Sequence, residues 1–211
     1  MPHQFALPIR LLHWTMAALI IAMLFIGVAM VSTAGPAYTA LLALHRPLGI
    51  AILLLACIRL ALRIGTRAPA LPDDLPRIQQ RAARASHVLL YLAMIGLPII
   101  GWAMLSAGSY PVRLGAGLVL PPILPPDALV FGGLRQLHAL AAFAFFALIL
   151  GHLTVALIHA FVRRDGVFAT MGFGRSADPE PAAPADSDGP GHPADNTEAP
   201  APGDVEAPPP P

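Results

Sequence analysis

Four apolar stretches of this chain are each long enough to cross a lipid bilayer as an α-helix. They cover residues 8–31, 42–63, 86–106 and 135–162. A helix needs roughly 20 apolar residues to span the hydrocarbon core, and inside lipid its backbone must satisfy its own hydrogen bonds. Because most connections between the stretches are short, the sequence predicts an all-α integral membrane protein folded as an antiparallel four-helix bundle.

The composition agrees with a membrane protein and argues against other classes. Hydrophobic residues make up 56% of the chain and charged residues only 12%. Soluble domains carry about twice that charged fraction, so a water-soluble enzyme and a nucleic-acid-binding protein are disfavoured. The single cysteine, Cys57, excludes an internal disulfide and a cysteine-rich metal or iron–sulfur site.

The end of the chain differs from the rest. Residues 176–211 carry eight acidic residues and no arginine, whereas residues 1–175 carry all 13 basic residues and four acidic ones. A segment this rich in proline and acidic residues cannot bury a core. We therefore predict a membrane domain over residues 1–175 and a disordered tail over residues 176–211.

The arginines predict the orientation of the bundle in the membrane. Most of those outside the apolar stretches lie in the second connection or after the fourth stretch: Arg67, Arg77, Arg81, Arg84, Arg163, Arg164 and Arg175. Positively charged connections stay in the cytoplasm, so both termini are expected there. The long, apolar, proline-rich connection over residues 107–134 is expected on the outer surface as a lid, with a short interfacial helix.

Histidines recur at the ends of the predicted spans, where polar side chains are costly and mark function. His138 and His152 are 14 residues apart, close to four helical turns and about 21 Å, so they project from one helix face. His45 shares the outer level with His138, and His13 shares the inner level with His152. The sequence thus predicts two stacked pairs of buried imidazoles.

Two such pairs suit two haems, each with an imidazole on either side of its iron. Gly49 and Gly151, close to His45 and His152, would give a porphyrin room. Arg46 and Arg135 at the outer level and Arg59 at the inner level are candidates to neutralise haem propionates. For Arg59, snorkelling to the inner interface remains an alternative.

Other interpretations of the histidines stay open. A single intramembrane histidine can simply hydrogen-bond a neighbouring helix. Zinc is disfavoured because neither level offers a carboxylate or cysteine, and a proton-relay transporter would need buried acids, which the spans lack. His87 and His159, near the cytoplasmic boundary, rival the others for the inner haem. They could equally serve a quinone pocket or proton delivery, with Arg10 and Arg163 as further inner-side candidates, or be ordinary interfacial residues.

Four motifs carry a resemblance to a known family. They are Arg10-Leu11-Leu12-His13-Trp14; His45 with Gly49 and the Arg59-Leu60-Ala61-Leu62-Arg63 exit; Ser86-His87 with Leu97-Pro98-Ile99-Ile100-Gly101; and His138 with Gly151-His152. Together they resemble the bacterial cytochrome b561 family of four-helix dihaem membrane proteins, over roughly residues 5–175. The resemblance implies haem b ligated by His13, His45, His138 and His152 in a bacterial inner membrane.

The resemblance also implies a function. One family member is known as a superoxide oxidase, which passes electrons from external superoxide through its haems to ubiquinone, whereas related cytochromes serve hydrogenases or dehydrogenases. The expected function is therefore electron transfer between the outer face and membrane quinone, with superoxide as the first candidate donor. The alternatives are an electron-transfer subunit of a partner dehydrogenase or hydrogenase and a haem-free membrane protein. A positive outer surface, with Arg46, Arg113 and Arg135 against Asp127, permits attraction of an anion.

Overall fold

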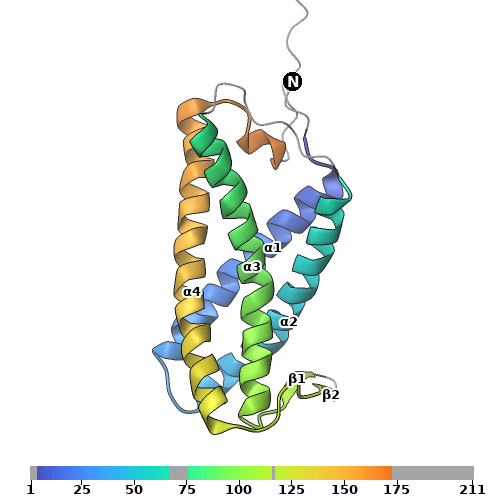
Figure 1. Ribbon diagram of the computed structural model, residues 1–211, viewed down its shortest axis with the longest axis vertical. Helices are drawn as coiled ribbons and strands as arrows, with labels where there is room; N and C mark the ends of the chain where they lie inside the picture. Colours follow the sequence, from blue (N-terminus) through green and yellow to red (C-terminus); the bar gives the residue numbers. More distant parts are fainter. Residues whose placement is uncertain (1–3, 67–75, 116, 173–211) are drawn as a thin grey trace, which may run out of the picture. The chain divides into compact units, whose positions relative to one another are not determined.

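The computed structural model describes residues 4–66, 76–115 and 117–172, and four long helices dominate it (Figure 1). They are α1 (Leu7–Val31), α2 (Pro36–Ile64), α3 (Arg77–Ala107) and α4 (Ala128–Leu157), and α4 continues into a π-helical turn at Ile158–Arg163. All four are long and apolar enough to cross a membrane. The predicted all-α four-span architecture is confirmed, while the predicted tail over residues 176–211 lies outside the described residues.

Each helix begins earlier than the apolar run predicted: proline opens α1 and α2, polar residues open α3, and an Asp127 cap precedes the apolar first turn of α4. Pro36 opens α2 with its fixed φ, directly after Gly35, whose φ of 66° favours glycine. The Asp127 side chain accepts a hydrogen bond of 2.9 Å from the Val130 N–H and so caps α4. Hydropathy therefore located the apolar segments but not the helix ends.

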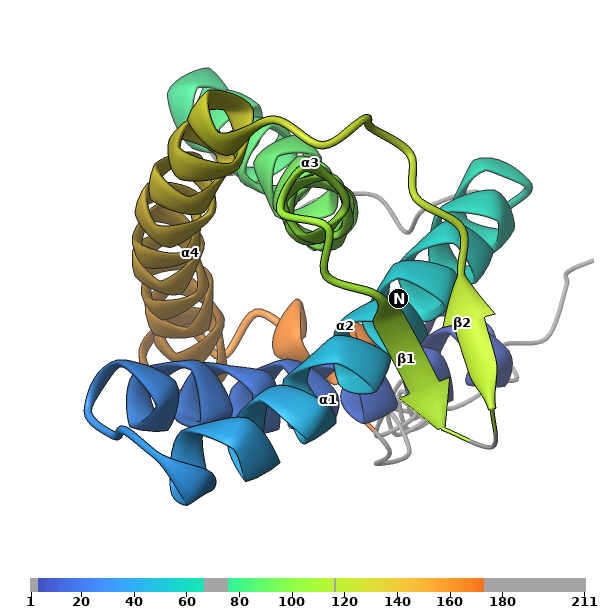
Figure 2. The ribbon, with the colours of Figure 1, turned by 90° about the horizontal axis from the view of Figure 1, so that it is seen from below.

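The connection between α3 and α4 forms a β-hairpin where a short interfacial helix was expected. Strands β1 (Val112–Gly115) and β2 (Leu118–Leu120) pair antiparallel, and β1 contacts α2 and α3 (Figure 2). The following segment is fixed to the end of α3: the Trp102 indole N–H donates 3.0 Å to the Pro121 carbonyl, and the Ile123 N–H donates 3.1 Å to Ser106 Oγ. The prolines and glycines of this loop disfavour a helix and suit these turns.

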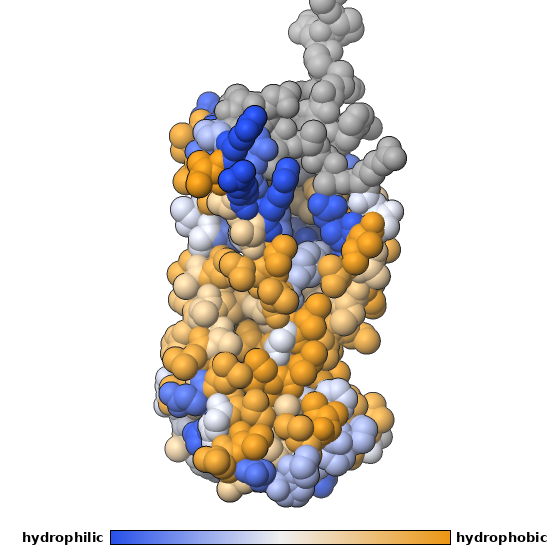
Figure 3. Space-filling model, in the orientation of Figure 1, coloured by the Kyte–Doolittle hydropathy of each residue, from blue (hydrophilic) through white to orange (hydrophobic). Residues whose placement is uncertain are grey.

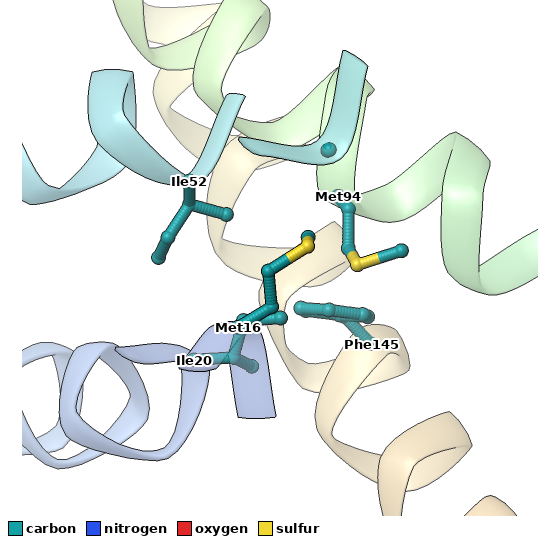
Figure 4. Close-up of a cluster of buried hydrophobic side chains, with 6 residues drawn as sticks. Met16, Ile20, Ile52, Met94 and Phe145 are labelled. Atoms are coloured by element: carbon teal, nitrogen blue, oxygen red, sulfur yellow. The ribbon is translucent and has the colours of Figure 1, made fainter. Parts of the chain in front are cut away.

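The buried core gathers side chains from all four helices (Figure 4). It consists of Met16 and Ile20 from α1, Ile52 and Ala56 from α2, Met94 from α3 and Phe145 from α4. Phe145 lies seven residues from His138 and seven from His152 along α4. A packed apolar layer thus separates the outer and inner histidine levels.

The outside of the bundle suits contact with lipid. Apolar side chains cover the middle of the face shown in Figure 3, and hydrophilic residues gather toward its two ends. Large aromatic residues point outward, with Phe25 70% and Phe143 69% exposed. Contiguous apolar surface on this scale marks an interaction surface, and on long apolar helices the partner is the bilayer. The chain is a multi-pass membrane protein with four spans.

Candidate functional site

The outer histidine pair meets inside the bundle. His45 from α2 and His138 from α4 place their ring centroids 6.2 Å apart, with 67° between the ring planes. The Nδ1 atoms of both rings are buried and have no hydrogen-bond partner among the described residues. Burying an imidazole nitrogen without a partner is costly, so the pair has the character of a ligand site.

The flanking arginines at the outer level differ in burial. The Arg46 guanidinium is partly buried, donates a 3.4 Å hydrogen bond to the Pro111 carbonyl beside the hairpin, and has a buried Nε without a partner within the described chain. Arg135, three residues before His138 on α4, is exposed. Arg46 is therefore the better placed of the two to meet an anionic group in the bundle interior.

The inner cluster contains one histidine more than its predicted pair. His152 has its ring centroid 5.8 Å from that of His87, and His13 lies within electrostatic reach of both. The Arg59 guanidinium carbon stands 5.7 Å from the centre of the Tyr91 ring, and its Nε is buried without a hydrogen-bond partner in the described ranges. Sequence reasoning treated His87 as a shallow rival, whereas the structure brings it against His152.

The packing of α3 against α4 explains why His87 lies beside His152. The two helices run antiparallel in close contact (Figure 1), with Met94 on α3 and Phe145 on α4 meeting in the core. Toward the inner end, His87 on α3 and His152 on α4 each lie seven residues from this contact. Toward the outer end, Gly101 on α3 and His138 on α4 also lie seven residues from it. The same spacing on α3 was available in the sequence and could have revealed both His87 and Gly101.

Gly101 is a site residue that sequence reasoning missed. Gly49 and Gly151 were expected to leave room for a porphyrin, and neither is crowded: a Cβ on Gly49 would be nearest to the Met23 methyl at 3.7 Å, and one on Gly151 would meet nothing within 4 Å. A Cβ on Gly101 would lie 3.3 Å from His138 Cε1. The residue that clears space for an outer histidine is therefore on α3.

A third group of polar side chains closes the inner end of α4. His159 Nδ1 lies 2.6 Å from Asp165 Oδ2, and Arg163 Nε donates to the same oxygen over 2.9 Å. Burial raises the pKa of Asp165, but hydrogen bonds from Arg163, His159 and the Val167 N–H outweigh it, so this pKa lies below its ordinary value. The sequence did not identify Asp165 as a partner for His159, although it is the acidic residue that follows α4 most closely in the chain.

The depressed pKa predicts how this cluster responds to acid. The ionised Asp165 contributes stability that is fully present above the ordinary carboxyl pKa and is lost as the pH falls through the depressed value. Asp165→Asn should therefore lower the melting temperature at neutral pH by about 2–4 °C and leave it less sensitive to pH in the acid range. Thermal unfolding in detergent followed by circular dichroism between pH 3 and 7 measures this; equal acid sensitivity in both proteins would contradict it.

Both ends of the bundle domain meet near the inner cluster. The Phe5 N–H donates 3.1 Å to the Thr170 carbonyl, and the Trp14 indole N–H donates 2.8 Å to the Met171 carbonyl. Trp14 also stands against His13, with ring centroids 5.7 Å apart. The segment after α4 thus braces the start of α1, which carries one of the inner histidines.

Imidazoles paired at two levels of a four-helix membrane bundle define a class of protein, the membrane-bound b-type cytochromes. No three histidine, cysteine or acidic side chains of the described residues converge as a cage for a metal ion. The family described as "Prokaryotic cytochrome b561" matches residues 4–174, and the chain belongs to it. It is accordingly a membrane electron carrier whose family cofactor is haem b, as the sequence motifs predicted.

Two of three similar proteins carry the name cytochrome b561, and the third is named as a probable superoxide oxidase. The chain is 26% identical over 173 residues, 81% of its length and 92% of the relative's, to "Cytochrome b561 homolog 2" of Escherichia coli (strain K12). It is 24% identical over 127 residues, 60% of its length and 72% of the relative's, to "Cytochrome b561 homolog 1" of the same organism. It is 32% identical over 130 residues, 61% of its length and 72% of the relative's, to "Probable superoxide oxidase CybB" of Yersinia pestis.

Proposed function

We propose that this cytochrome holds two haems b and transfers electrons from the outer face of the membrane to a quinone, with superoxide as the donor. The observation that carries the proposal is the arrangement of buried imidazoles at two levels, with the Met16–Phe145 core layer between them. Haem iron bound at each level would supply one-electron redox chemistry, and the chain would supply ligands, charge and exclusion of water.

The proposed ligands are His45 with His138 for the outer haem and His13 with His152 for the inner haem. Each pair spans two helices that share few close contacts, α2 with α4 and α1 with α4, which leaves space for a macrocycle between them. The close approach of the partly buried His45 and His138 rings, 6.2 Å between centroids, supports a bound group at the outer level. His87 sits on α3, which packs tightly against α4, so a haem between His87 and His152 would have to separate the two helices.

Arginines would compensate the negative charge of the haem propionates. Arg46 at the outer level and Arg59 at the inner level each have a buried Nε without a partner in the described residues. A carboxylate beside such a guanidinium removes the cost of the unpaired donor and adds a charge-assisted hydrogen bond. Arg135, being exposed, is a weaker candidate for the same role.

The orientation proposed from the arginines puts the outer pair on the non-cytoplasmic side and both termini in the cytoplasm. The outer surface would then carry three arginines, Arg46, Arg113 on β1 and Arg135, and one aspartate, Asp127. Its net charge would be positive. Such a surface raises the encounter rate with a small anion. Superoxide is an anion, and one relative is named as its probable oxidase.

The proposal is tested by mixing oxidised protein with a superoxide source in a stopped-flow spectrophotometer, with ubiquinone present. We expect haem reduction to outpace spontaneous dismutation and quinol to accumulate in proportion. Haem reduction no faster than dismutation allows would refute superoxide as the donor. A large partner dehydrogenase or hydrogenase that co-purifies and reduces the haems would support the alternative function as its electron-transfer subunit.

Electrostatic attraction of the donor makes a separate prediction at Arg113. Arg113→Glu reverses one charge of the outer surface without touching either histidine pair, and it should lower the second-order rate constant several-fold at low ionic strength. The difference should shrink as salt rises, because exposed charges are screened within about 10 Å at 0.1 M. Arg81→Glu, at the opposite end of the bundle, is the matched control and should leave the rate constant unchanged.

A further inference from the structure

Gly101 on α3 lies directly against the outer histidine of α4. A Cβ built on it would stand 3.3 Å from Cε1 and 3.5 Å from Nδ1 of His138. The first distance is tighter than most real Cβ contacts, so a side chain here would make the ring shift by a few tenths of an ångström, whereas the second is ordinary van der Waals contact. The imidazole therefore approaches the α3 backbone more closely than another residue at position 101 would permit.

The backbone that Gly101 exposes includes a hydrogen-bond acceptor. The carbonyl of residue i in an α-helix points toward residue i+4, whose Cβ partly screens it. For the Leu97 carbonyl that residue is Gly101, which has no Cβ, and this carbonyl lies close enough to the His138 ring to interact with it. Yet His138 Nδ1 forms no hydrogen bond within ordinary limits in the described chain.

The two levels differ at this position. At the inner level α3 presents His87 to His152, and 14 residues further along α3 it presents Gly101 to His138. The outer histidine thus faces backbone where the inner one faces another imidazole. Histidines that ligate a metal usually donate their second ring N–H to a carboxylate, carbonyl or water, which fixes the ring and raises its basicity.

We propose that Gly101 is a positioning residue for the outer haem: it lets His138 donate its Nδ1–H to the Leu97 carbonyl, which leaves Nε2 for the iron. The inference rests on the proposed function, in which His138 is an axial ligand. It accounts for the short approach of the ring, the unscreened carbonyl and the otherwise unpaired Nδ1. Its consequence is that a backbone acceptor on α3 helps set the properties of the outer haem.

The test is Gly101→Ala, with Gly96→Ala as the matched control. Gly96 lies on the same helix, and a Cβ there would meet nothing within 4 Å. Alanine favours a helix over glycine, so neither change weakens α3 itself. In Gly101→Ala the ring is displaced and the hydrogen bond to Leu97 is lost. The weaker ligand stabilises ferric iron less, so the midpoint potential of one haem should rise while that of the other is unchanged.

Three readouts decide the outcome: haem content by pyridine haemochrome, redox titration of each haem, and transfer of haem to apomyoglobin. Support requires two haems in the wild type, with one haem of Gly101→Ala titrating at a higher potential and leaving roughly 10–100-fold more readily, as for other supporting residues of metal ligands. Wild-type behaviour of Gly101→Ala overturns the inference and leaves the proposed function standing. Equal effects in Gly96→Ala also overturn it, because the cause would then be general to α3. A wild type without two haems refutes the proposed function itself.

Discussion

Replacement of His138 with alanine is expected to remove one of two haems and to leave the other in place. Among the described residues the outer pair has no substitute ligand: His45 and His138 are the two imidazoles that meet at this level, and the α3 residue opposite His138 is a glycine. The apolar layer around Met16 and Phe145 isolates the inner cluster from the change. Pyridine haemochrome analysis should fall from two haems per chain to one.

The matched control is His159→Ala. His159 lies on the same helix as His138 and is partly buried, but its Nδ1 is engaged by Asp165 at the end of the bundle. We expect this variant to retain both haems. If His138→Ala keeps two haems, or if His159→Ala loses one, the ligand assignment at the outer level is wrong. Far-ultraviolet circular dichroism of each variant checks that the helices have formed.

The inner level gives the second large effect, because three histidines compete there for two ligand positions. We expect His13→Ala to lose the inner haem and His87→Ala to retain it. The argument is steric: α3 and α4 are packed together, whereas α1 and α4 share few close contacts. The 5.8 Å separation of the His87 and His152 rings then reflects contact between neighbouring helices and not ligation.

The same pair of variants can reverse the assignment. If His87→Ala loses a haem while His13→Ala retains two, then His87 and His152 ligate the inner iron, and α3 and α4 must separate to admit it. Electron paramagnetic resonance of the ferric protein adds a second readout. With His13 as ligand, His87→Ala should change the spectrum of one haem only slightly, since His87 would be a neighbour of His152. His13→Ala should remove that low-spin signal.

The sequence predicted the helices and the outer pair well because both follow from simple regularities. Apolar run length identifies a span, and a 14-residue interval puts His138 and His152 on one face of a helix. Helix ends were predicted less well, since they depend on Pro36, Asp127 and polar first turns, which hydropathy does not register. The hairpin was missed because glycine and proline signal turns without specifying which strands pair.

The inner cluster could be predicted only in part. Depth along each helix placed His13 and His152 at one level, but depth alone does not say which helices touch. The neighbour of His152 is set by the antiparallel register of α3 and α4, in which Met94 faces Phe145. The sequence named Gly101 only as part of a motif on this helix, and its closeness to His138 appeared only in the structure. The spacing of residues within one helix could be taken from the sequence, but which residues of different helices touch could not.

The position of α4 in the chain has a consequence for biosynthesis. Every proposed pair takes one member from this helix, His138 at the outer level and His152 at the inner level, and α4 follows the other three described spans along the chain. Neither cofactor can gain its second ligand until that span has entered the bilayer. If α4 supplies one ligand to each haem, as proposed, each haem gains both ligands only when α4 has joined the three described helices that precede it.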